Sequence, residues 1–197
     1  MCGRFVVDDV VWEEVEALVG QIDHSAIKNG DRYPSGQIFF LGAKQDGMTA
    51  PFAPHCAYWG YPGFEKGKLL INARSETVRQ RPVFRHDFEK RRCVIPARGF
   101  YEWNAKKEKF YFTGTDRVLY LAGIYKKEEK GECVTILTTQ ANASVKQVHD
   151  RMPLLIPGGR IARWMEETEW AAAFLKEEMP ALKAQKESGG YEQLSLF

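Results

Sequence analysis

The second residue of the chain, Cys2, directly follows the initiator methionine. Its small side chain allows an aminopeptidase to remove Met1, which would leave cysteine as the free amino terminus. Such a residue carries an amine and a thiol on adjacent carbons, with reference pKa values of about 8 and about 8.5. The amine can condense with an aldehyde to an imine, and the thiol can then close a five-membered thiazolidine. Electropositive surroundings would activate the sulfur further. The alternative is an ordinary residue at a frayed terminus.

A second candidate feature is Asn72-Ala73-Arg74, which follows a short apolar run. The end of a strand is a place from which side chains reach a groove. Asparagine offers both a hydrogen-bond donor and an acceptor, and arginine offers a planar fork suited to phosphate. A turn carrying a surface salt bridge is the equally simple structural interpretation.

Two further residues could move protons. Strand alternation places Glu102 on the same face as Phe100 and opposite Tyr101 and Trp103. Apolar surroundings would raise the pKa of this carboxyl toward a range useful for acid/base catalysis, although a structural pairing is the alternative. His149 is the best histidine candidate, because the other three lie in polar or proline-rich stretches.

Many short strands and few helices must position these residues. The apolar patterning predicts strands beginning at Arg4 and over residues 37–41, 69–71, 93–96, 99–103, 110–112, 118–125, 133–139 and 154–156. It predicts helices from Asp8 or Asp9 to Val19, from Ser144 to Val148, over 161–165 and over 169–176, with a brief one capped by Ser75. The expected fold is α+β, a single domain built on a curled, barrel-like, mostly antiparallel sheet with peripheral helices. The domain should span residues 1–179, and residues 180–197 should form a flexible tail.

Composition narrows the class of protein. A chain of 197 residues that is 44% hydrophobic and 27% charged is typical of a soluble globular domain. No apolar run reaches membrane-spanning length and no signal peptide is evident, so a cytoplasmic protein is expected. Four dispersed cysteines without a C-x-x-C pair argue against zinc and disulfides, and no metal or cofactor is expected.

Charge is unevenly distributed along the chain. The net charge is only +2, but residues 74–98 are rich in arginine. A basic block on a nearly neutral chain favours a face that binds a polyanion, against the alternative of a solvated surface with scattered counterions.

These features belong to a set of motifs that follow one another along the chain. The motifs are Met1-Cys2-Gly3-Arg4-Phe5, Trp59-Gly60, Ile71-Asn72-Ala73-Arg74-Ser75-Glu76-Thr77, Arg91-Arg92-Cys93-Val94-Ile95-Pro96-Ala97, Gly99-Phe100-Tyr101-Glu102-Trp103, Thr138-Thr139 and His149-Asp150-Arg151-Met152-Pro153. The set resembles the SRAP family, the SOS response-associated peptidases or abasic-site processing proteins. The resemblance runs from Cys2 to about Ile156.

The resemblance implies a DNA-repair function. SRAP proteins bind single-stranded DNA and trap the aldehyde of an abasic site on the N-terminal cysteine as a thiazolidine cross-link, which shields the site from strand cleavage. Met1 would first be lost, by self-processing or by an aminopeptidase. The expected activities are therefore those of a thiol autopeptidase-type hydrolase and of a lyase-like enzyme in the SOS response.

Roles for single residues follow from the matching motifs. By resemblance, Cys2 is the nucleophile, Asn72 orients the opened sugar or the cysteine amine, and Glu102 is the acid/base. His149 would assist ring opening of the sugar and reversal of the cross-link. The implied DNA contacts are Arg4, Arg74, Arg81 and Arg151 for phosphates and Trp59 and Trp103 for base stacking.

Two positions depart from the family pattern. The chain has Tyr33-Pro34-Ser35-Gly36-Gln37 where relatives commonly carry Tyr-Asn-x-Ala-Pro-Thr, and Arg98 stands where an acidic residue is frequent. The covalent chemistry therefore carries over more directly than any preference for a strand junction.

The extreme C-terminus resembles a separate motif. Gln193, Leu194, Leu196 and Phe197 match the bacterial sliding-clamp binding pentapeptide Gln-Leu-x-Leu-Phe. A polar tail that delivers two apolar side chains to a pocket is an economical way to reach a partner. The alternative is that the apolar end folds back on the domain.

Two other classes of function remain open from the residues alone. An N-terminal nucleophile amidohydrolase or thiol protease would share Cys2 and His149 but would need no basic face. A non-catalytic single-strand-binding module would bind intact and abasic strands equally and form no covalent product.

Overall fold

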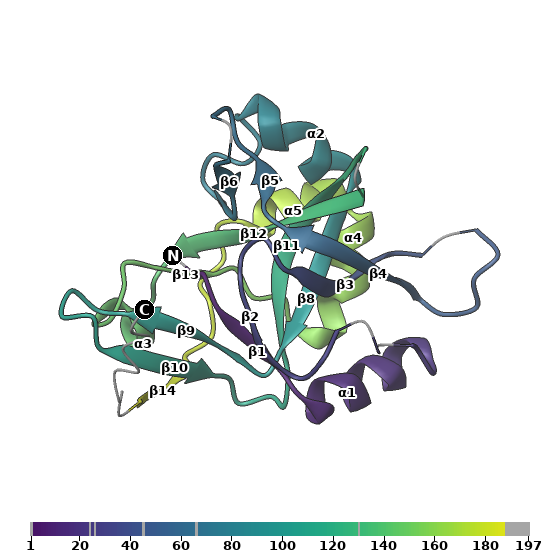
Figure 1. The fold of residues 1–197 in the computed structure, drawn as a ribbon. Coiled ribbons are helices and arrows are strands. Elements are labelled where there is room, and N and C mark those ends of the chain that lie inside the picture. Colours follow the sequence, from purple (N-terminus) through teal and green to yellow (C-terminus); the bar gives the residue numbers. More distant parts are fainter. Residues whose placement is uncertain are drawn as a thin grey trace, which may run out of the picture.

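Five strands close into a barrel in the computed structural model, which describes residues 2–23, 25, 27–44, 46–65, 67–129 and 131–187. The ring order is β11-β8-β3-β4-β12, and β12 pairs back onto β11 (Figure 1). Neighbours are antiparallel except β4 and β12, which run parallel. The bounds of these strands are β3 Gln37–Ala43, β4 Phe52–Trp59, β8 Arg92–Ala97, β11 Leu119–Glu128 and β12 Gly131–Gln140.

The barrel interior holds the centre of the hydrophobic core. Ile38, Phe40, Ile95, Leu121 and Ile136 have no exposed surface. Full burial of such side chains contributes roughly 1.5–3 kcal/mol each. The predicted fold class, an α+β domain with a barrel-like and mostly antiparallel sheet, is confirmed.

A second sheet lies beside the barrel and carries the start of the chain. Its order is β14-β10-β9-β1-β2, and all neighbours are antiparallel. Phe5 pairs with Phe100, and the Tyr101 N–H donates to the Arg4 carbonyl at 2.9 Å, so the predicted N-terminal strand is confirmed. The bounds are β1 Phe5–Val7, β2 Gly30–Arg32, β9 Gly99–Trp103, β10 Lys109–Thr113 and β14 Lys183–Lys186.

The domain extends further toward the C-terminus than the sequence predicted. Residues 183–186 were expected in a flexible tail from Pro180, but they form strand β14, which pairs with β10. The four residues are Lys-Ala-Gln-Lys and all are exposed. These residues form a strand because their backbone pairs with β10. Their side chains contain no apolar pattern from which a strand could be predicted.

The helices and short strands cover the two sheets. Helix α1 begins as predicted, because the Asp8 side chain accepts from the Val11 N–H at 3.2 Å. The brief helix expected at Ser75 is instead a run of turns followed by α2, and the strand expected at 154–156 lies at 151–153. No helix in the described part of the chain is both long and apolar enough to span a membrane. The remaining bounds are α1 Asp9–Val19, β5 Tyr61–Pro62, β6 Leu69–Leu70, β7 Asn72–Arg74, α2 Pro82–Lys90, α3 Ala143–Lys146, β13 Arg151–Pro153, α4 Ile161–Glu166 and α5 Thr168–Phe174.

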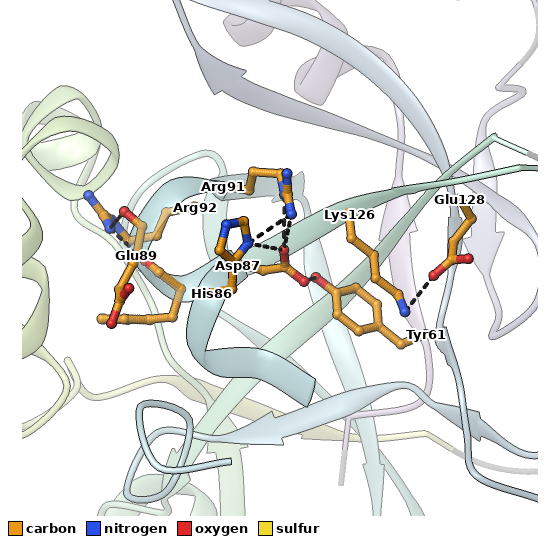
Figure 2. Close-up of polar contacts among 9 residues, drawn as sticks. Tyr61, His86, Asp87, Glu89, Arg91, Arg92, Lys126 and Glu128 are labelled. Atoms are coloured by element: carbon orange, nitrogen blue, oxygen red, sulfur yellow. Dashed lines mark hydrogen bonds and ion pairs between the residues drawn. The ribbon is translucent and has the colours of Figure 1, made fainter. Parts of the chain in front are cut away.

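A buried carboxylate attaches α2 to the rest of the fold (Figure 2). Asp87 is 5% exposed and accepts from the Tyr61 hydroxyl at 3.0 Å and from Arg91 Nε at 2.9 Å. Lys126 Nζ lies 4.8 Å from the centre of the Tyr61 ring and 2.5 Å from Glu128. The hydrogen bonds from Tyr61 and Arg91 stabilise the Asp87 carboxylate, because burial of an unpaired charge is unfavourable in free energy.

Arg92 joins the ends of two helices through hydrogen bonds to backbone carbonyls. Its guanidinium is buried and donates to the carbonyls of Phe88 and Trp164 at 2.5 Å each and of Met165 at 2.8 Å. These carbonyls belong to the last turns of α2 and α4, where helix dipoles favour a cation. Burial nevertheless lowers the pKa of Arg92.

Replacing Arg92 should therefore destabilise the fold strongly. Arg92→Ala leaves several buried carbonyls without a donor and is expected to lower the free energy of unfolding by about 3–5 kcal/mol. Urea unfolding followed by circular dichroism measures this change. Arg163→Ala, which breaks a half-exposed ion pair with Glu167, is the control and should cost less than about 1 kcal/mol. Equal losses in the two variants would contradict the assigned role of Arg92.

Candidate active site

The chain start and strand β7 meet through a direct hydrogen bond. Asn72 Nδ2 donates to the Cys2 carbonyl oxygen at 2.9 Å. Strand β7 is held in place by parallel pairing of Asn72 with Ile136 on β12. Asn72 Oδ1 is buried and accepts no hydrogen bond from any residue that the structure describes. One end of the amide therefore holds the backbone of Cys2, while the other end is available to a bound group.

Strand β9 places a carboxyl group beside Cys2. Glu102 is 2% exposed and shares the inner face of β9 with Phe100, as strand alternation predicted. Burial raises the pKa of Glu102, and the nearby charge of His149 partly offsets this effect. The carboxyl therefore holds its proton to higher pH than an exposed glutamate does, the direction that favours acid/base catalysis.

The Cys2 thiol is not activated by its surroundings. Its side chain is fully buried, and burial together with the charge of Glu102 raises the pKa of the thiol well above its usual range. A hydrogen bond from the Arg4 backbone N–H opposes this only partly. The side chain that acts on the thiol is the carboxylate of Glu102, so the electropositive surroundings that would activate the sulfur are not found here. The sulfur in this buried state is a protonated thiol.

His149 has a defined neutral tautomer. The histidine lies in the turn between α3 and β13, where its Nδ1 is 2.9 Å from the Arg151 backbone N–H. A backbone N–H can only donate, so Nδ1 accepts and the neutral ring carries its proton on Nε2. Asp150 Oδ1 is also 3.0 Å from Nδ1, a contact to which only a protonated Nδ1 could donate. The two contacts thus belong to different protonation states, and the Asp150 side chain is 85% exposed.

The structure brings the four predicted catalytic residues together from separate parts of the chain. Asn72 contacts Cys2 directly, Glu102 acts electrostatically on the Cys2 thiol, and His149 acts electrostatically on Glu102. They come from the segment before β1, from β7, from β9 and from the α3–β13 turn. The cluster combines a thiol next to the start of the chain, a hydrogen-bonding amide, a carboxyl group and an imidazole.

Trp59 does not lie where a base could stack on it. Its ring is fully buried and packs against Phe5 at a centroid distance of 5.2 Å. Its indole N–H donates to the Ile71 carbonyl at 2.9 Å. The predicted stacking role is wrong for this fold, because the apolar run that contains Trp59 is a barrel strand and not a loop.

Two of the predicted phosphate contacts are engaged within the protein. Arg4 forms an ion pair with Asp31, and its guanidinium lies 4.8 Å from the centre of the Tyr101 ring. Arg151 donates to Glu76 at 2.9 Å, and its side chain is 11% exposed. Arg151 lowers the pKa of Glu76 through this hydrogen bond. These partners were missed, although Glu76 stands in the same motif as Asn72.

Other predicted DNA contacts remain accessible. Arg74 and Arg81 are exposed, and Trp103 at the end of β9 is half-buried. The proposed clamp residues Gln193, Leu194, Leu196 and Phe197 lie outside the described residues. Within the described ranges, no group of histidine, cysteine, aspartate and glutamate side chains could hold a metal ion.

The chain is similar in sequence to known proteins of one family. The family model for SOS response associated peptidase (SRAP) matches residues 1–189. Abasic site processing protein YoaM of Bacillus subtilis is 28% identical over 196 residues, which covers 89% of this chain and 84% of YoaM. Abasic site processing protein YedK of Escherichia coli is 25% identical over 182 residues, which covers 85% of this chain and 80% of YedK.

Solved structures show the same fold. A crystal structure of a protein from Bordetella bronchiseptica superposes with a TM-score of 0.76 at 22% identity, covering 94% of this chain and 99% of that one. One from Bacteroides thetaiotaomicron gives 0.77 at 20% identity, covering 94% and 91%. With its family model spanning nearly the whole length, the chain belongs to the SRAP family.

Proposed function

We propose that this protein processes abasic sites by binding single-stranded DNA and joining Cys2 to the sugar as a thiazolidine. The Asn72–Cys2 hydrogen bond carries the proposal, because it holds the start of the chain beside a buried carboxyl group. The names of the relatives YoaM and YedK support the choice of an abasic site as substrate. The Cys2 nitrogen is a peptide amide while Met1 is attached, so Met1 must leave first, either by self-processing or through an aminopeptidase.

The first step releases the aldehyde. An abasic deoxyribose exists mainly as a closed ring, which opens when its ring oxygen gains a proton and its C1′ hydroxyl loses one. His149 carries a proton on Nε2 and is suited to protonate the ring oxygen. The C1′ hydroxyl proton passes to water or to a carboxylate, and the C1′–O bond to the ring breaks.

The second step forms the imine. The Cys2 amine attacks C1′, a C–N bond forms, and the carbonyl oxygen takes up a proton to become a hydroxyl. Glu102 in its protonated form then protonates this hydroxyl, which leaves as water while the nitrogen loses its proton. The raised pKa of Glu102 keeps this proton available to higher pH than on an exposed glutamate. Asn72 Oδ1 is suited to accept from the amine and hold its lone pair toward C1′.

The third step closes the ring. The Cys2 thiol adds across the C=N bond, so that sulfur bonds to C1′ and the thiol proton passes to nitrogen. No net proton is gained or lost, and a preformed thiolate is not required. The raised pKa of the thiol therefore favours an order in which the amine reacts first.

Recognition of the strand is proposed to be independent of sequence. Arg74 and Arg81 are exposed cations that could contact phosphates, and the half-buried Trp103 could support a base.

The tail motif at Gln193–Phe197 is proposed to bring the protein to the sliding clamp, and so to cytoplasmic replication sites. Reversal of the cross-link would be the lyase-like activity, and release of Met1 the peptidase activity.

A cross-linking assay tests the proposed function. Protein whose loss of Met1 is verified by mass spectrometry is incubated with a single-stranded oligonucleotide containing one uracil, treated with uracil-DNA glycosylase. A denaturing gel should show a shifted band that resists heat and detergent. The same oligonucleotide without glycosylase treatment is the control and should give none. Absence of the band with the abasic strand would contradict the proposal.

A further inference from the structure

One side chain connects the helix before His149 with the C-terminal segment of the domain. Asn142 Oδ1 caps α3 by accepting from the Ser144 N–H at 3.0 Å and from the Ser144 hydroxyl at 2.6 Å. Asn142 Nδ2 donates to the carbonyls of Met179 and Pro180 at 2.9 Å each. We call residues 179–187 the strap. Both ends of the Asn142 amide are used, one for the helix and one for the strap.

The strap itself is firmly attached at its start. Met179 is 5% exposed and Leu182 is 7% exposed, so both side chains lie in the core. The Leu182 N–H donates to the Ser144 hydroxyl at 3.0 Å, and the Leu155 N–H points to Met179 Sδ at 3.0 Å. Helix α3 and its cap are therefore joined to the strap by hydrogen bonds of the Asn142 and Ser144 side chains.

The other end of the strap belongs to the sheet that carries Glu102. Strand β14 pairs Lys186 with Phe110 on β10, and Phe110 pairs in turn with Glu102 on β9. Figure 1 shows the yellow strand β14 at the outer edge of this sheet, beside β10. The strap thus contacts α3 and also forms the edge strand of the sheet that carries the proposed acid/base.

Helix α3 transmits this attachment to His149. The helix has four residues, and the His149 N–H donates to the Val145 carbonyl at 3.0 Å directly after it. A helix of one turn has little stability of its own and takes its position from tertiary contacts. The Ala141 N–H also donates to the Asp150 carbonyl at 2.9 Å, which holds the ends of the turn together. Asn142 holds the N-terminal end of α3 against the strap.

We propose that Asn142 is a positioning residue of the active site, which sets the placement of His149 relative to Glu102 by binding the strap. The inference rests on the proposed function and deepens it. Because the ends of the turn have their own hydrogen bonds, loss of the strap contacts would displace His149 slightly without unfolding the site.

The test is Asn142→Ser. Serine is a good helix cap and can keep the bond to the Ser144 N–H, but it cannot donate to the Met179 and Pro180 carbonyls. The rate of cross-linking under single-turnover conditions should fall roughly tenfold, since small misplacements of catalytic groups are costly. Affinity for an intact strand should not change. The limb of the pH–rate profile that reports Glu102 should move to higher pH, because a more distant His149 lowers the pKa of Glu102 less.

Controls separate positioning from general loss of stability. Val15→Ala removes buried apolar contacts in α1, away from the site, and should leave the rate and pH profile unchanged below its melting temperature. Ser144→Ala removes only the hydroxyl contacts and serves if Asn142→Ser does not fold. A rate and profile like those of Val15→Ala would overturn the inference. Failure of the unmodified protein to cross-link would contradict the proposed function instead, so the two failures are distinguishable.

Discussion

Cys2→Ala is expected to abolish the stable cross-link while leaving a weaker, hydrolysable adduct. After Met1 is removed, alanine still presents an α-amine beside Asn72 and Glu102, and this amine can form an imine with the opened sugar. Without sulfur the imine cannot close to a thiazolidine. The heat-stable band should therefore fall below detection, whereas borohydride, which reduces an imine to a stable amine, should restore a covalent product.

Cys56→Ala is the matched control for this experiment. Cys56 is an exposed thiol on β4 and its sulfur is far more accessible than the fully buried Cys2 sulfur. Its replacement should leave the heat-stable band unchanged. A stable band with Cys2→Ala, or loss of the band with Cys56→Ala, would contradict the assignment of Cys2 as the residue that joins DNA.

The candidate catalytic residues could be proposed from sequence because each belongs to a local motif. Glu102 lies in a five-residue strand whose alternation correctly placed it on the inner face with Phe100. Its neighbours across the sheet, and hence its coupling to Cys2, depend on pairing between distant segments. The raised pKa of the Cys2 thiol could not be predicted from the sequence for this reason, since Glu102 is one hundred positions away in the chain.

The errors have a common physical origin. Trp59 was predicted to stack on a base, but it ends strand β4, which pairs antiparallel with β3 and parallel with β12 and buries the ring. Strand β14 was assigned to a tail because its side chains are polar, although its backbone groups pair with β10. Both elements are ordered by long-range backbone hydrogen bonds, which leave little trace in the pattern of apolar residues.

Glu102→Gln should slow cross-linking while making the protein more stable at neutral pH. Glutamine keeps the shape of the side chain but cannot transfer a proton, so the rate should fall by about 10²-fold, the lower range for general acid/base catalysis. Single-turnover cross-linking between pH 5 and pH 9 measures the loss. The pH dependence assigned to Glu102 should vanish together with the rate.

The stability change has a definite sign. The pKa of Glu102 is raised in the folded protein, so the folded state binds more protons than the unfolded state above the unfolded value of about 4.3. Stability is therefore lost as pH rises from that value through the folded pKa, and Glu102→Gln removes this loss. The difference in unfolding free energy between the variant and the unmodified protein should grow from pH 4 to pH 8.

Glu108→Gln provides a control of opposite sign. Lys186 and Asn104 lower the pKa of Glu108, so its carboxylate stabilises the fold above its unfolded pKa, and this contribution is lost as pH falls through the folded pKa. Glu108→Gln should not increase stability at neutral pH and should leave cross-linking unchanged. If Glu102→Gln instead destabilised the protein at pH 8 and retained full activity, Glu102 would be a structural pairing residue. A gain in stability together with a loss of activity is the combination expected when a buried carboxyl group is kept for proton transfer.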